Sequence, residues 1–112
     1  MPMTFQDREQ GFEAKFAHDE ERRFLTTARR DKLFAQWAAN TLHLSDEAAK
    51  ATLHDVLSIQ DGPDHDRALL RYMADFMSAR GAGLSESDLS AVLGRCMQQA
   101  LLQVGGLPPD PL

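Results

Sequence analysis

Four histidines, a single cysteine and a run of aspartates are the residues of this 112-residue chain whose types suit metal or nucleophilic chemistry. His43, His54 and His65 recur every 11 residues, a spacing that would align them on one continuous helix. Ser45 and the Gly-Pro pair at 62–63 interrupt such a helix, because serine caps a helix start and Gly-Pro ends a helix. The spacing therefore does not predict a metal site.

The remaining candidates for chemistry have simpler structural interpretations. Asp61, Asp64 and Asp66 are spaced like calcium ligands, but the 12-residue calcium loop should close with Glu at a position occupied by Tyr72. Asp64 and Asp66 suit a helix start instead. Cys96 falls on an apolar helix face, where a packed and inert thiol is expected. The chain has no glycine-rich phosphate loop and no Cys/His ligand spacing, so we expect a protein that is not an enzyme and holds no metal.

His18 is a titratable residue next to three carboxylates, Asp19, Glu20 and Glu21. Neighbouring carboxylates favour the charged imidazolium, so the protonation of His18 could change near neutral pH. The alternative is a solvent-exposed histidine with no role.

The charged stretch from Thr4 to Glu21 carries a narrow aromatic stripe. Phe5, Phe12 and Phe16 are spaced by seven and four residues, which places them on one side of a helix. A core helix of a small domain normally has a wider apolar face. The pattern predicts an arm whose aromatic side chains become buried, and whose helix becomes fully formed, when the arm binds a partner. The alternative is a stripe that folds back onto the rest of the chain.

These residues carry a family resemblance. The motif TFQDREQGFEAKFAHDEE, followed by Phe24, Ala28-Arg29-Arg30, Lys32-Leu33 and Trp37-Ala38-Ala39, resembles the alphaproteobacterial zeta subunit family. Members of that family are natural inhibitors of the F-type ATP synthase, and many are known only as a domain of unknown function. The detailed resemblance covers residues 4–39, and beyond them only the helical pattern matches.

The resemblance implies a four-helix bundle with a mobile N-terminal helical arm. It implies that the arm inserts into the catalytic head of the synthase, where the alpha, beta and gamma subunits meet, and blocks rotation in the hydrolytic direction. The partner-binding residues expected on the arm are Phe5, Arg8, Phe12, Lys15, Phe16 and His18. The family is also similar to weak binders of adenine nucleotides. No motif here matches that property, so we expect no cofactor and assign no nucleotide-binding residue.

Composition and charge agree with a small soluble regulator. Residues 1–44 hold seven Lys/Arg and seven Asp/Glu, whereas residues 45–112 hold five and ten. An acidic second half argues against nucleic acid, whose binding depends on cationic contacts to phosphate. No apolar run approaches the length of a membrane span, and the N-terminus lacks a signal-peptide pattern. We expect a cytoplasmic monomer that reaches the inner membrane only peripherally, through the synthase.

The hydrophobic periodicity predicts an all-α fold, an antiparallel four-helix bundle with the arm outside it. The first bundle helix has a wide apolar face, which consists of Phe24, Leu33, Phe34, Trp37, Thr41 and Leu42. We expect Trp37 to be its largest core residue. Arg29 and Arg30 should lie at the edge of this face with their charged heads in water. The second helix follows the cap Ser45 and should bury Leu53, Val56 and Leu57. The third helix should start near Asp64 and end before Gly81. The fourth helix follows the Ser85–Asp88 capping box and should bury the apolar residues from Leu89 to Val104, Leu101 included.

Three segments follow from this pattern: an arm at 1–20 that is partly disordered when free, a bundle at 21–105 and a non-helical tail at 106–112. Two other functions remain open. The chain could be an adaptor that uses the arm on a different partner, or a nucleotide sensor whose arm merely packs on the bundle.

Overall fold

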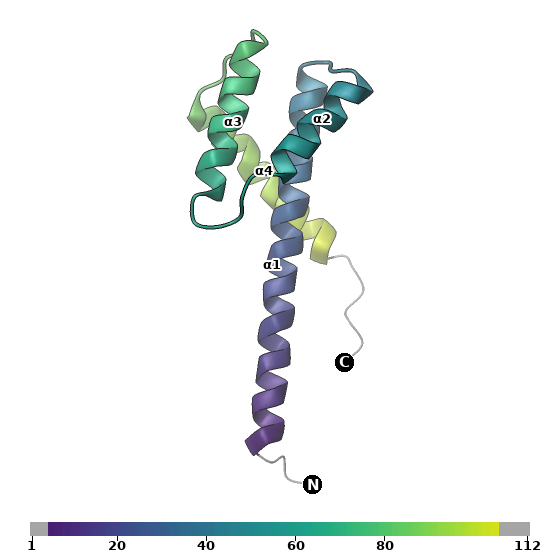
Figure 1. Cartoon of the computed structure of the whole chain (residues 1–112), viewed down its shortest axis with the longest axis vertical. Helices are drawn as coiled ribbons and strands as arrows, with labels where there is room; N and C mark the ends of the chain where they lie inside the picture. The colour runs from purple at the N-terminus through teal and green to yellow at the C-terminus, as the bar shows by residue number, and fades with distance from the viewer. Residues whose placement is uncertain (1–4, 106–112) are drawn as a thin grey trace.

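The computed structural model describes the backbone of residues 5–105 and the side chains of residues 19–105. In this part of the chain the structure consists of four helices, α1 (Phe5–Thr41), α2 (Asp46–Leu57), α3 (His65–Ala79) and α4 (Glu86–Gly105), and contains no strand. Successive helices alternate in direction, with α2 turning back beside α1 and α4 running diagonally across α1 (Figure 1). The predicted all-α fold is confirmed.

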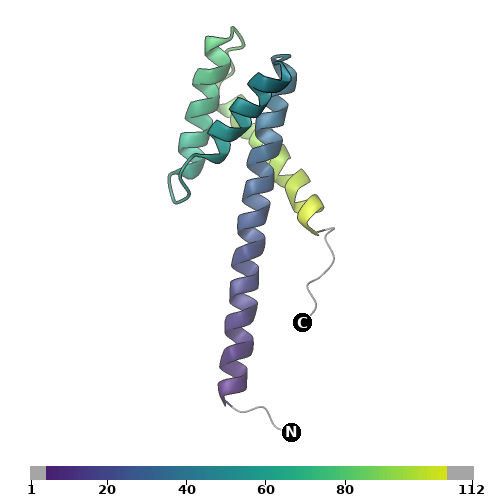
Figure 2. The same ribbon diagram turned by 45° about the vertical axis from the view of Figure 1, so that its right-hand side comes forward.

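Helix α1 is 37 residues long and passes without interruption from the predicted arm into the bundle (Figure 2). Its C-terminal half packs against α2 and α4, while α3 packs against α4. The expected boundary between residues 20 and 21 lies inside this helix, so it coincides with no break in secondary structure. The conformation of the tail at 106–112 and the side chains of residues 1–18 lie outside the part that the structure describes.

The helix ends follow the capping chemistry of the sequence. The Ser45 hydroxyl accepts a hydrogen bond from the backbone N–H of Ala48 at 3.2 Å and caps α2. At the start of α4 the backbone N–H of Asp88 donates to Ser85 Oγ at 3.1 Å, and the Asp88 carboxylate accepts from the Ser85 N–H at 3.4 Å. This reciprocal pair is the predicted capping box.

The turn after α3 requires glycine. Gly81 has a φ of +80°, and the N–H of Ala82 reaches back to the Met77 carbonyl at 2.9 Å. This geometry is the left-handed helix ending that glycine adopts without steric cost, as expected for the residue that follows the cap.

The core lies where all four helices meet. Its fully buried large side chains are Phe34, Val56, Leu69, Met73, Met77 and Leu89. Trp37 is only partly buried and stacks on Phe34, with ring centroids 5.7 Å apart and an interplanar angle of 5°. Phe34 is therefore the fully buried aromatic residue of the core, and Trp37, which was predicted to be the largest core residue, packs against the core while part of its side chain contacts water.

Three further apolar residues expected in the core are exposed: Phe24 by 61%, Leu57 by 51% and Leu101 by 56%. Thr41, placed on the same face as Trp37, is also exposed. Leu57 is the last residue of α2, where the chain turns away. Phe24 lies near the middle of α1 and Leu101 lies close to the end of α4, and neither side chain belongs to the core cluster or packs against it.

This difference in burial predicts different costs for truncating the two stacked aromatics. Phe34→Ala should lower the free energy of unfolding by about 3–5 kcal/mol, because it leaves a cavity in the core. Trp37→Ala should cost clearly less, because part of that side chain already contacts water. Urea unfolding of both variants measures the difference, and an equal or larger loss in Trp37→Ala would contradict this account of the core.

Candidate functional site

The predicted partner-binding residues are all carried by the N-terminal part of α1. The backbone places Phe5, Arg8, Phe12, Lys15, Phe16 and His18 on one continuous helix. Their side chains lie outside the described residues, so their roles stay predictions. The structure does describe the C-terminal part of α1, which continues this segment into the bundle. There, three buried charged residues and the exposed Asp66 form a cluster.

Arg30 and Asp31 of α1 are buried, with exposed fractions of 5% and 3%. The Arg30 guanidinium bonds the Asp31 carboxylate, with Nη2 and Oδ1 2.9 Å apart. It also makes a two-pronged contact with Asp66 on the first turn of α3, at 2.7 and 3.2 Å. Arg30 thus joins two carboxylates from different helices, an arrangement for which its planar fork of donors is suited.

His65, the first residue of α3, completes the cluster. Its Nε2 lies 2.6 Å from Asp31 Oδ2, and its Nδ1 lies 3.1 Å from the Gln60 carbonyl and 3.9 Å from the Asp61 carboxylate. An ionised carboxylate and a carbonyl can only accept hydrogen bonds, so both ring nitrogens must donate. The geometry therefore calls for the doubly protonated, cationic imidazolium.

Electrostatics support the same protonation state. Burial by itself would lower the pKa of His65, but its hydrogen bonds to Asp31 and Gln60, together with the Asp31 charge, outweigh burial and raise the pKa. The hydrogen bond from Arg30 lowers the pKa of Asp66. Two cations and two anions then balance, and no buried side-chain nitrogen or oxygen among the described residues lacks a partner.

The loop between α2 and α3 positions His65. The loop backbone bends at Gly62, whose φ of +134° is open to glycine but strained for other residues. The His65 N–H then donates to the Gly62 carbonyl at 3.1 Å and starts the helix. Because His65 bonds both this loop and Asp31, the cluster fastens the start of α3 to the middle of α1.

This cluster was not predicted from the sequence, and the prediction for Arg30 was wrong. Arg30 was expected to hold its head in water, yet its head is buried among carboxylates. Asp66 was interpreted as a helix-start residue, and it does lie in the first turn of α3, but its carboxylate binds Arg30. A signal was available, because Arg30 and Asp31 precede the core residue Phe34 by four and three positions and so share its helix face.

The other candidates for chemistry behave more simply. Cys96 is buried, and burial raises the pKa of its thiol, which agrees with the expected packed cysteine. His43 and His54 are exposed and do not join His65. Among the described residues no group of three or more His, Cys, Asp or Glu side chains could hold a metal ion.

The cluster predicts a stability that depends on pH through His65. Because the pKa of His65 is raised in the folded state, its contribution is fully present below the ordinary value of about 6.5 and is lost as pH rises through the raised pKa. Urea unfolding should therefore give a free energy that declines above neutral pH. His65→Gln should remove this decline and, at pH 6, cost about 3 kcal/mol, because Asp31 loses a buried partner.

His54→Gln is the matched control for this measurement, because His54 is exposed on α2. This variant should keep the decline of the parent protein. If His65→Gln retained the same dependence on pH as the parent, the cationic state of His65 would be contradicted.

Among the described helices, none combines the length and the apolar character that a membrane span requires.

The chain was compared with known protein families, curated proteins and solved structures. No curated protein and no solved structure gave a significant match. A family model described as ATPase inhibitor subunit zeta matches residues 2–103, which span all but the first residue of the predicted arm and all but the last two residues of α4. The chain therefore belongs to the ATPase inhibitor subunit zeta family.

Proposed function

We propose that this protein inhibits ATP hydrolysis by the F-type ATP synthase, with residues 1–20 as the inhibitory arm. The arm enters the catalytic head as a helix where the alpha, beta and gamma subunits meet, and blocks rotation in the hydrolytic direction. The observation that carries the proposal is the family match, which includes the arm as well as the bundle. The protein acts as a regulatory subunit and catalyses no reaction itself.

The unbroken helix α1 connects the arm rigidly to the bundle. A helix without a break between the arm and the bundle transmits force along its axis, whereas a flexible hinge would let the bundle swing. The stretch from Phe5 to Glu21 is about 25 Å long at 1.5 Å per residue, enough to reach deep into a subunit cleft.

The bundle gives the arm a base that resists displacement. The Arg30–Asp31–His65–Asp66 cluster ties α3 to α1 about 15 Å beyond the arm along the helix axis. The packing of α1 against α2 and α4 buries Phe34, Ala35 and Ala38 in the core. The contacts of α1 with the other helices thus oppose any force that pushes the arm out of its binding site.

The side chains proposed to bind the partner have two kinds of chemistry. Phe5, Phe12 and Phe16 serve as apolar anchors, each worth about 1.5–3 kcal/mol when fully buried. Arg8 and Lys15 pair with acidic groups of the head, and His18 supplies a titratable contact. The bundle stays outside as a monomer, and the protein reaches the membrane surface only through the synthase.

Substitution of the close aromatic pair tests this proposal. Phe12→Ala and Phe16→Ala should each weaken inhibition of ATP hydrolysis by about 30-fold or more, as expected for hot spots of at least about 2 kcal/mol. The measurement adds each purified variant to the catalytic head of its own organism. The free energy of unfolding of the free variants should stay within about 0.5 kcal/mol of the parent.

Glu13→Ala, on another side of the same helix, is the control and should lose much less inhibition. A destabilisation of the free protein by about 3 kcal/mol in the phenylalanine variants would show that the stripe packs on its own bundle. If the parent protein left ATP hydrolysis unchanged, the inhibitory function would be wrong for this chain.

A further inference from the structure

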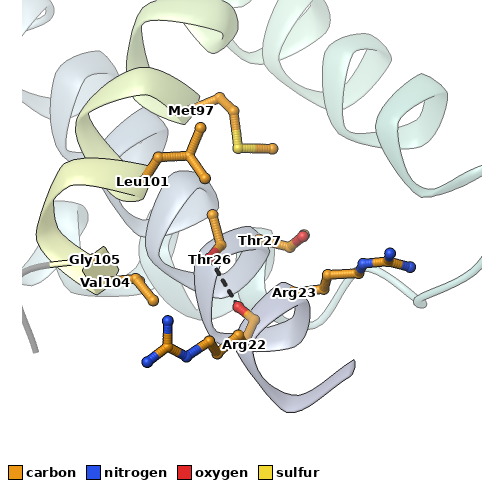
Figure 3. A pocket seen from close by; sticks show the side chains of 8 residues that line it. All are labelled: Arg22, Arg23, Thr26, Thr27, Met97, Leu101, Val104 and Gly105. Atoms are coloured by element: carbon orange, nitrogen blue, oxygen red, sulfur yellow. Dashed lines mark hydrogen bonds between the residues drawn. The ribbon is translucent and has the colours of Figure 1, made fainter. Parts of the chain in front are cut away.

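A groove runs between α1 and α4 at the end of the bundle nearest to the arm. It has a volume of about 540 Å³, and Figure 3 shows the side chains on both of its walls. Thr26 and the arginines Arg22 and Arg23 come from α1, and Met97, Leu101 and Val104 come from α4. The α4 wall is apolar, and the lining contains two cationic residues and no acidic one.

One side chain of the apolar wall is open to solvent, whereas Val104 of the same wall is only 8% exposed. Leu101 is 56% exposed, although it faces the groove in the middle of the last turns of α4. A neighbouring hollow shares Arg23, Thr27 and Met97 with the groove and adds Phe24, which is 61% exposed. The two exposed side chains thus lie in adjoining hollows, the second of which is also lined by Glu20, Asp61 and Asp66. Exposed large apolar side chains that lie near one another mark a surface for binding another protein.

The position of the groove on α1 connects it with the arm. Arg23 follows Phe16 by seven residues and Phe12 by eleven, and Thr27 follows Phe16 by eleven. Seven and eleven residues are close to whole numbers of helical turns, so these positions share one side of a continuous helix. The groove begins about 10 Å along the helix axis from Phe16.

We infer that the α1–α4 groove is a second contact with the partner that the arm binds, and that it accepts an apolar segment of the catalytic head that carries carboxylates. The occupant follows from two observations. A partner that covers the aromatic stripe continues along the same side of α1 into the groove. Once there, it meets an apolar wall beside Arg22, where a carboxylate next to apolar side chains is the complementary chemistry, while Arg23 is paired with Glu20 at 3.2 Å. This inference rests on the proposed inhibitory function.

The same leucine-to-glutamine substitution, made inside and outside the groove, tests whether the groove contacts the partner. Leu101→Gln should weaken inhibition of ATP hydrolysis by the organism's own catalytic head about tenfold or more. Leu57→Gln is the matched control, because Leu57 is 51% exposed at the end of α2 and lines no part of this groove. Leu57→Gln should inhibit like the parent, and both free variants should unfold at the midpoint of the parent. Arg22→Glu should weaken inhibition and make the remaining inhibition less sensitive to salt.

The outcomes separate this inference from the proposed function. If the parent protein and Phe16→Ala differ in inhibition while Leu101→Gln inhibits like the parent, the groove is not a contact and the inhibitory function stands. If the parent does not inhibit at all, the function itself fails.

Two further results would assign the groove to another occupant and overturn the inference. One is a concentration-dependent dimer of the parent protein in sedimentation that Leu101→Gln abolishes, which would identify a second copy. The other is a loss of stability on removing residues 106–112 that Leu101→Gln reproduces, which would identify the chain's own C-terminal residues.

Discussion

The buried contact between Asp31 and His65, 2.6 Å long, is the interaction on which the arrangement of the helices depends. It joins the middle of α1 to the start of α3 across 34 residues of sequence, and Arg30 reinforces it through Asp66. Taking the charges of Arg30, Asp31 and His65 out of water is costly, and the cost is offset because each charge meets an opposite charge or a hydrogen-bonding partner. Apolar side chains in the same places would leave more freedom in how α3 meets α1, since their packing is not directional.

This clamp explains how one helix can serve two purposes. Helix α1 takes part in the core through Phe34 and its neighbours, and it also carries the residues proposed to bind the synthase. The core residues among the side chains that the structure describes lie between Thr26 and Val104. A long helix held firmly at one end is a structure suited to obstruct a rotating assembly, and the bundle supplies the firm end.

Local chemistry made most of the fold predictable from the sequence. Ser45, the Ser85–Asp88 box and Gly81 are where capping and glycine geometry place them, because these effects depend on a few neighbouring residues. Which residues of each helix are buried was predicted less well. Leu101 is apolar yet exposed and Arg30 is charged yet buried, because their surroundings depend on the crossing of α1 and α4 and on a partner 36 residues away. The predicted site residues on the arm were found by resemblance, and the family match supports that resemblance.

The most direct test of the account is a truncated protein that lacks residues 1–17. The account assigns folding to the bundle and inhibition to the arm, so one variant tests both halves. Thermal unfolding followed by circular dichroism should show a midpoint within a few degrees of the parent, while inhibition of ATP hydrolysis should be lost. A large drop in the midpoint, or inhibition that survives the truncation, would contradict this division of the chain.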